Sequence, residues 1–215
     1  MAAVEKNNED SEEKAGFGKG AGFEKKAGFE KEVRELVEAG YSGVEEAILA
    51  CKKCPLHESA TNKVIGKGSR TPKVLFIGEA PGKNEDEKGI PFCGRAGKEL
   101  DKMLEYMRLS EEDWAVINTL KCRPPENRNP KKSELEACKS FLAAQITLLD
   151  PKVVILLGST AEKAYCPGKK LEWGVPEEIG GRMVLKIYHP AALIYTRSRI
   201  ETQHALIDEN RGLWE

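Results

Sequence analysis

The sequence contains no long hydrophobic run. Although 40% of its 215 residues are hydrophobic, no apolar stretch approaches the ~18–20 residues that a membrane-spanning helix needs. The first residues are charged and lack the apolar segment of a secretory signal. We therefore expect a protein that has no membrane partner, is not secreted and works in the cytoplasm.

Charge of one sign is not in excess either. The chain has 34 basic and 35 acidic residues, a balance that argues weakly against a nucleic-acid partner. Residues 1–38 hold 10 acidic and 7 basic residues, however, which leaves 25 acidic against 27 basic residues in the remainder, a net charge of +2. Residues 121–132 have a net charge of +4. A solvated loop and a phosphate-contacting loop both explain this segment. Its basic residues are Lys121, Arg123, Arg128, Lys131 and Lys132.

Large apolar residues are rare in the first 32 positions. An acidic stretch is followed by three six-residue repeats, AGFGKG, AGFEKK and AGFEKE, at residues 15–32. One phenylalanine per repeat cannot build a core, and the glycines oppose a stable helix. We predict that residues 1–32 are a disordered tail and that residues 33–215 form one domain.

Strand-like and helix-like segments alternate in that domain. Apolar runs predict four strands, at residues 73–77, 114–120, 153–157 and 183–188. Helical patterns fall at residues 98–107, 133–149 and 200–210, and after residue 159. Capping boxes Ser133/Glu136 and Ser159/Glu162 predict the start of two of these helices. The alternation indicates an α/β fold, a three-layer α/β/α sandwich with a central, largely parallel, four-stranded sheet.

Unusual polar residues follow the predicted strands. In open α/β sheets, ligands bind beyond the carboxyl ends of the strands. That rule selects residues 78–82, 118–122, 158–159 and 189–193. Glu79, Asn118 and His189 fall in three of these segments, so we expect a functional site at this edge. A lone histidine is more often structural, but its place at a strand end favours a role in chemistry.

Four of the six cysteines have a spacing that suggests one metal site. Cys51 and Cys54 form a C-x2-C pair, and Cys122 and Cys138 are separated by fifteen residues. Zinc sites usually pair two C-x2-C units, which this spacing fits poorly. Iron–sulfur clusters tolerate irregular spacing, because each cysteine binds a different iron. Ordinary buried cysteines remain the alternative, and we interpret Cys93 and Cys166 as packing residues.

A segment rich in glycine and proline, residues 78–97, links a predicted strand to a helix. It does not match G-x-x-x-x-G-K-[ST] or G-x-G-x-x-G, so nucleotide-binding loops of those types are not supported. Phe92 lies among its glycines, where it can be either a stacking platform for a planar ligand or a residue that packs a turn.

These segments together resemble the family 4, or iron–sulfur, uracil-DNA glycosylases. The resemblance covers about residues 47–210. It rests on GEAPG at residues 78–82 with Glu85-Asp86, on GIPFCGRAG at 89–97, on NTLKCRPPENRNP at 118–130 and on HPAAL at 189–193. Cys93 departs from the usual aliphatic residue. Residues 123–130 lack the histidine of the covalent uracil-trapping relatives, which favours an enzyme that turns over.

The resemblance implies a DNA-repair enzyme that flips uracil out of DNA and hydrolyses its N-glycosidic bond. It implies catalytic roles for His189, which would donate to uracil O2, and for Glu79, which would position water. The implied DNA contacts are Arg123, Asn127 and Arg128, and the implied ligands of a [4Fe-4S] cluster are Cys51, Cys54, Cys122 and Cys138. The implied substrate-binding residues are Gly78, Ala80, Gly82, Glu85, Phe92, Asn118 and, as the wedge that fills the vacated stack, Leu193.

Other functions remain open at this level. A non-catalytic iron–sulfur nucleic-acid binder would not need Glu79, Asn118 and His189 together. A redox protein would not need the pocket segments, and a glycosylase of wider deaminated-base specificity would use the same residues. The expected partner is uracil-containing DNA, single- or double-stranded, which a monomer would clasp beside the chromosome.

Overall fold

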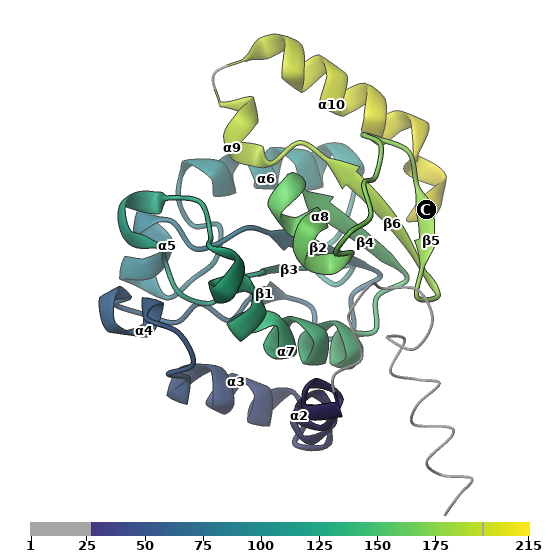
Figure 1. Ribbon diagram of the computed structural model, residues 1–215. Coiled ribbons are helices and arrows are strands. Elements are labelled where there is room, and N and C mark those ends of the chain that lie inside the picture. Colours follow the sequence, from purple (N-terminus) through teal and green to yellow (C-terminus); the bar gives the residue numbers. More distant parts are fainter. Residues whose placement is uncertain (1–26, 195) are drawn as a thin grey trace, which may run out of the picture.

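The computed structural model of the protein describes residues 27–194 and 196–215, and its centre is one six-stranded sheet (Figure 1). The strand order is β1-β3-β2-β4-β6-β5. The four inner strands run parallel to one another. They are β2 (Val74–Gly78), β3 (Trp114–Asn118), β4 (Val153–Leu157) and β6 (Arg182–Ile187).

The predicted α/β fold and parallel sheet are therefore confirmed, but the strand count of four is wrong. Two short strands, β1 (Lys67–Gly68) and β5 (Glu177–Ile179), pair antiparallel with β3 and β6 at the two edges. They have two and three residues, too few to show an apolar alternation in the sequence.

Helices cover both faces of the sheet and produce the three layers (Figure 1). One face packs on α6 (Arg95–Met107), and α10 (Arg197–Glu209) contributes Ile207 to the same core. The other packs on α7 (Lys132–Leu149) and α8 (Ser159–Tyr165). Successive residues of β2 alternate between the two cores, with Phe76 on the α6 side and Leu75 and Ile77 on the α7 side.

The amino-terminal helices pack outside these three layers, on α7. Helices α2 (Ala27–Glu38) and α3 (Gly40–Ala50) contact α7, and a separate apolar cluster fills the space between α3, α4 (Leu56–Ser59) and α7. Residues 27–32, which we predicted to be disordered, are the first turns of α2. Their third repeat is helical because Phe29 and Glu32 find partners on Lys139 and Ser140. Residues 1–26 of the predicted tail lie outside the described residues.

Neither predicted capping box forms. Helix α7 begins at Lys132, and it is Glu134 that accepts the backbone N–H of Lys131, at 2.8 Å. Helix α8 follows Gly158, whose φ of +86° allows the sharp turn out of β4. Glu162 is buried and pairs with Lys186 at 2.8 Å instead of capping the helix.

The remaining elements are short. They are α5 (Lys83–Lys88), α9 (Pro190–Leu193) and the 3-10 turns η1 (Pro125–Asn127) and η2 (Arg211–Leu213). Among the residues described, no helix is long and apolar enough to cross a bilayer.

Candidate active site and cysteine site

Asn118 and Gly78 lie opposite each other at the carboxyl ends of β3 and β2. A Cβ atom on Gly78 would lie 2.4 Å from the Oδ1 atom of Asn118 and 2.8 Å from the Cζ atom of Phe92. Only glycine therefore leaves room for both side chains. The Asn118 side chain is 2% exposed, and its Oδ1 atom has no hydrogen-bond partner within the described residues. A buried polar atom without a partner is costly, so this oxygen is a position where a ligand donor would bind.

Phe92 lies beside that amide in a strained conformation. Its φ is +50°, which is rare for an aromatic residue, and its side chain is 6% exposed. Gly97, in the first turn of α6, makes this turn possible, because a Cβ there would lie 1.8 Å from the Phe92 carbonyl oxygen. The Phe92 ring centroid lies 5.7 Å from that of His189, with the rings tilted by 30°. Strain that persists next to a buried amide is typical of a functional site.

His189 follows β6 and begins the short helix α9. Its Nδ1 atom accepts the backbone N–H of Ala191 at 3.1 Å. An accepting Nδ1 places the proton of the neutral ring on Nε2. Burial lowers the pKa of His189 to about 4, against a smaller opposite effect of the Glu85 charge. His189 is therefore a neutral hydrogen-bond donor at neutral pH.

Glu79 and Glu85 have different environments. The carboxylate of Glu79 is half-buried and makes no hydrogen bond or ion pair within residues 27–194 and 196–215. The carboxylate of Glu85 is fully engaged, accepting the backbone N–H groups of Gly82 at 3.1 Å, Cys93 at 3.0 Å and Gly94 at 2.8 Å. Glu79 is therefore available to water and substrate, whereas Glu85 holds the start of α5 to the loop that carries Phe92.

The side chain of Leu193, the predicted wedge, is 5% exposed and lines a groove between α6 and α10 together with Met103 and Tyr106. Ala80 follows Glu79 in the chain and contacts the apolar cluster near α3. The predicted pocket residues that the structure brings close together are thus Gly78, Phe92, Asn118 and His189, with Glu79 next to Gly78 and with Gly82 and Glu85 bracing the loop.

The basic segment is less exposed than its charge suggests. Lys121 is not part of an exposed basic surface, because its side chain is 2% exposed and its Nζ donates to the Asn118 carbonyl oxygen at 2.6 Å. Arg128 forms two hydrogen bonds to the Glu134 carboxylate, at 2.9 and 2.5 Å. Arg123 donates to Asn127 Oδ1 at 2.7 Å. The partner of Arg123 is a neutral amide, whereas the positive charge of Arg128 is paired with the Glu134 carboxylate.

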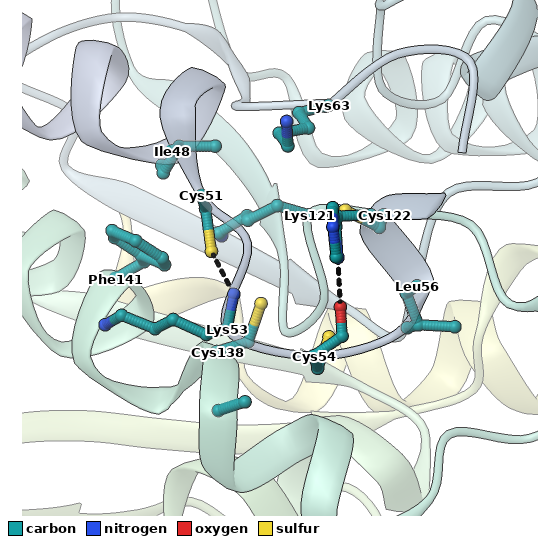
Figure 2. Close-up of a pocket in the computed structure, with 12 residues that line it drawn as sticks. Ile48, Cys51, Lys53, Cys54, Leu56, Lys63, Lys121, Cys122, Cys138 and Phe141 are labelled. Carbon is teal, nitrogen blue, oxygen red and sulfur yellow. Dashed lines mark hydrogen bonds between the residues drawn. The ribbon is translucent and has the colours of Figure 1, made fainter. Parts of the chain in front are cut away.

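The four predicted cysteine ligands line one hollow, with their sulfur atoms around a common space (Figure 2). Cys51 and Cys54 come from the turn after α3, Cys122 from the segment after β3 and Cys138 from α7. Within the part of the chain that is described, no three histidine, cysteine or acidic side chains form a group that could hold a single metal ion, whereas in an iron–sulfur cluster each cysteine binds a different iron. Cys93 and Cys166 lie outside this hollow, as predicted.

Electrostatics couple these thiols to one another. Burial, and to a smaller extent the neighbouring Cys138, Cys54 and Cys51, raise the pKa of Cys122 to about 12, against a lowering by Lys63. Burial also raises the pKa of Cys138, against a lowering by Lys121. The Cys51 sulfur accepts the Lys53 backbone N–H at 3.5 Å. The four cysteine sulfurs are soft ligands, and they line one hollow beside the buried cation Lys121. This set of residues suits an iron–sulfur cluster, which is bound by thiolates and has a net negative charge when they are included.

Lys121 is the residue of this site whose role the sequence analysis missed. It lines the same hollow as the four thiols, and desolvation lowers its pKa to about 8 against a raising by Cys138. Its charge was counted with the exposed loop because it begins the basic segment. The signal for burial was its place between Leu120, at the end of an apolar run, and a candidate ligand, Cys122.

Comparison with known proteins agrees with this geometry. The family model described as "Uracil DNA glycosylase superfamily" matches residues 65–209. This match covers the sheet, the pocket residues and two of the four cysteines, and it defines the class of protein.

Individual relatives narrow the class. The chain is 41% identical over 160 residues to a type-4 uracil-DNA glycosylase of Thermotoga maritima, a match that covers 72% of this chain and 83% of the relative. It is 40% identical over 159 residues to the type-4 enzyme of Archaeoglobus fulgidus, covering 69% and 80%. A type-5 uracil-DNA glycosylase of Pyrobaculum aerophilum is 26% identical over 156 residues, covering 63% of this chain and 69% of the relative. The chain therefore belongs to the type-4 uracil-DNA glycosylases.

Proposed function

We propose that this chain excises uracil from DNA by hydrolysing the bond between the base and its deoxyribose, which leaves an abasic site for base excision repair. The observation that carries the proposal is the unpartnered Oδ1 atom of Asn118 between Gly78 and Phe92. An amide offers one donor and one acceptor, and the imide edge of uracil offers the complementary pair. To reach this pocket, the nucleotide must leave the base stack.

Phe92 supplies the stacking surface for the flipped base. Its ring borders both Asn118 and His189, so a base on that ring would present one edge to each residue. Stacking on an aromatic side chain contributes ~1–3 kcal/mol per base. Glu85 acts indirectly on the base, because it fixes the backbone of the Phe92 loop through Cys93 and Gly94. It is thus a positioning residue for base recognition, including the exclusion of the thymine methyl group.

His189 stabilises the departing base. As the glycosidic bond breaks, negative charge develops on the uracil and positive charge on the sugar. The Nε2–H group, fixed by the Ala191 contact, donates to uracil O2 as that charge appears. A preorganised donor of this kind is worth ~3–4 kcal/mol in the transition state. A neutral imidazole donates without a change of protonation state, which the low pKa of His189 provides.

Glu79 acts on the sugar side. Its carboxylate is unengaged and follows β2 at the same sheet edge, where it positions the attacking water and stabilises the cationic sugar. Ala80, the next residue, carries no carboxylate, so Glu79 supplies the carboxylate at this strand end. The products are free uracil and an abasic deoxyribose.

The four hollow-lining cysteines are proposed to hold a [4Fe-4S] cluster. Through these cysteines a bound cluster would cross-link the 51–54 turn, the segment after β3 and α7, and hydrolysis of a glycosidic bond would require no redox step from it. Arg123, Asn127 and Arg128 lie between two of these cysteines in sequence and are proposed to contact DNA phosphates. The working form is proposed to be a monomer that acts on chromosomal DNA in the cytoplasm, on single or double strands.

The test uses labelled oligonucleotides that carry one uracil, thymine or hypoxanthine, with strand scission by alkali after incubation. The iron-replete protein is expected to cleave at uracil and not at thymine, and Asn118→Ala is expected to lower the rate of cleavage severely, to a residual rate that is measurable with excess enzyme. His204→Ala is the matched control, because His204 stacks on Tyr106 at 3.8 Å on the outer helices and not in the pocket. Binding without cleavage at any base would instead support the non-catalytic binder. Equal cleavage at hypoxanthine would assign a wider substrate range.

A further inference from the structure

Lys121 is buried without a carboxylate partner. Its side chain is one of the largest fully buried ones, yet no ion pair reaches it within the described residues. By contrast, the other buried lysine, Lys186, pairs with Glu162 at 2.8 Å. A buried ammonium group that lacks an anion is strongly unfavourable. The anion must therefore come from whatever occupies the space that Lys121 lines.

That space is the hollow of the four cysteines (Figure 2). Four thiolates around an oxidised cluster carry more negative charge than the cluster core carries positive charge, so the occupied site is anionic. Lys121 lines this hollow together with Cys122 and Cys138, and its side chain is fully buried there. The ammonium group of Lys121 is thus placed as the counter-ion of the occupied site.

The same ammonium group also reaches the substrate pocket. Its Nζ atom donates to the backbone carbonyl oxygen of Asn118 at 2.6 Å, across a turn of three residues. This bond fixes the peptide that carries the Asn118 side chain. Backbone bonds from Thr119 to the Gly78 carbonyl, at 3.0 Å, and from Leu120 to the Glu79 carbonyl, at 3.1 Å, hold the rest of the turn against β2. Residues 119 and 120 are therefore held by β2, whereas the carbonyl group of Asn118 is held by Lys121.

We propose that Lys121 is a positioning residue that joins the two sites: it is the counter-ion of the occupied cysteine site, and it holds Asn118 in the position that recognises uracil. The inference rests on the proposed function and gives the cysteine site a part in base recognition. Loss of the cluster would then impair recognition of uracil through the Asn118 turn as well as through loss of stability.

The test compares three variants of the iron-loaded protein. Lys121→Met removes the charge and the donor, whereas Lys121→Gln removes the charge and keeps a donor. Lys63→Met is the matched control, because Lys63 lines the same hollow but donates to the Leu49 carbonyl oxygen, at 2.7 Å, and not to Asn118. Iron content per chain, reduction potential and kcat/KM on uracil-containing DNA are measured for each.

We expect Lys121→Met to lower kcat/KM by ~10- to 100-fold, which is the usual effect of losing a residue that orients a ligand-binding side chain without contacting the ligand. Both Lys121 variants should lower the reduction potential or the iron content more than Lys63→Met does, because the cation of Lys121 is fully buried whereas that of Lys63 is half-buried. Lys121→Gln should keep more activity than Lys121→Met. In an Asn118→Ala background, Lys121→Met should have less than about a threefold further effect, since coupled residues are not additive.

Equal and additive losses in the two backgrounds would overturn the positioning role. An unchanged potential and iron content in both Lys121 variants would overturn the counter-ion role. These outcomes are distinct from failure of the proposed function, in which the unmodified protein itself would not cleave uracil-containing DNA.

Discussion

The backbone N–H of Ala191 donates to the Nδ1 atom of His189 at 3.1 Å. This contact, which also begins helix α9, determines which ring nitrogen carries the proton. The pocket-facing chemistry of His189 therefore follows from a backbone turn two residues away and not from a second catalytic side chain.

The pH dependence of turnover follows from this arrangement. The folded-state pKa of His189 is lowered from 6.5 to about 4, so the active neutral ring is present above that value and is lost as the pH falls through it. We expect no decline in kcat/KM from this group between about pH 8 and pH 5. A decline centred near pH 6.5 that disappears in His189→Asn would contradict the assignment.

Removal of the His189 ring should affect the chemical step. We expect His189→Ala to lower the rate constant of cleavage, measured with excess enzyme, by about 10²- to 10³-fold. This factor corresponds to a loss of ~3–4 kcal/mol of transition-state stabilisation. Affinity for the uracil-containing strand should change little, because the donor acts mainly in the transition state. His204→Ala is the control and should retain normal kcat, and a loss confined to KM would refute this role for His189.

Gly78 tests the close packing of the pocket. An alanine Cβ would lie 2.4 Å from Asn118 Oδ1, so we expect Gly78→Ala to displace that amide, to destabilise the fold by ~1–3 kcal/mol and to impair uracil cleavage. Gly28→Ala is the matched control. Gly28 lies in helix α2, and a Cβ atom at this residue would meet nothing within 4 Å. Thermal unfolding and cleavage assays measure both effects, and equal behaviour of the two variants would be inconsistent with the packing described.

A substitution of Glu85 tests whether its carboxylate holds the backbone of the loop that carries Phe92. Glu85→Gln leaves one oxygen to accept three backbone N–H groups, so we expect a loss of ~1–3 kcal/mol in stability and weaker binding of uracil-containing DNA. Glu87→Gln, at an exposed position of the same helix, should change neither quantity. A Glu85→Gln variant of normal stability that loses only discrimination against thymine would indicate direct contact with the base instead.

Lys53 links the amino-terminal helix to the cysteine turn. Its Nζ pairs with Glu32 and donates to Ser140 Oγ at 3.0 Å, and Ser140 Oγ donates to Glu32 at 2.9 Å. We expect Lys53→Met to accelerate release of iron to a chelator, because the turn between Cys51 and Cys54 loses its tie to α2 and α7. Lys52→Met, at an exposed neighbouring position, should release iron at the normal rate, and equal rates in both variants would contradict this tie.

Much of the fold could be predicted because its inner strands are continuous apolar runs. Residues such as Phe76 and Ile155 are buried on a sheet covered on both faces, a pattern that is visible in the sequence. The rule that ligands bind at the carboxyl ends of parallel strands correctly selected the neighbourhood of Asn118 and His189. Edge strands β1 and β5 could not be predicted, since so few residues form them.

The finer roles depended on backbone positions that the sequence does not display. Glu85 accepts from a loop eight and nine residues away, and Glu134, not Glu136, meets the start of α7. Lys121 looked like part of a basic surface, because its burial depends on how the turn after β3 folds back toward Asn118. Leu193, predicted as the wedge that fills the vacated stack, lines a groove between α6 and α10, and its role as a wedge stays a prediction.

The central claim is that these residues release uracil as a free base. The most direct measurement is mass-spectrometric detection of free uracil after the iron-loaded protein is incubated with a single-uracil oligonucleotide, beside a Glu79→Gln/His189→Ala double variant. The account predicts one uracil and one abasic strand per substrate with the unmodified protein, and an intact oligonucleotide with the double variant. Free uracil released equally by both proteins would contradict the assigned site, and none released by the unmodified protein would contradict the activity itself.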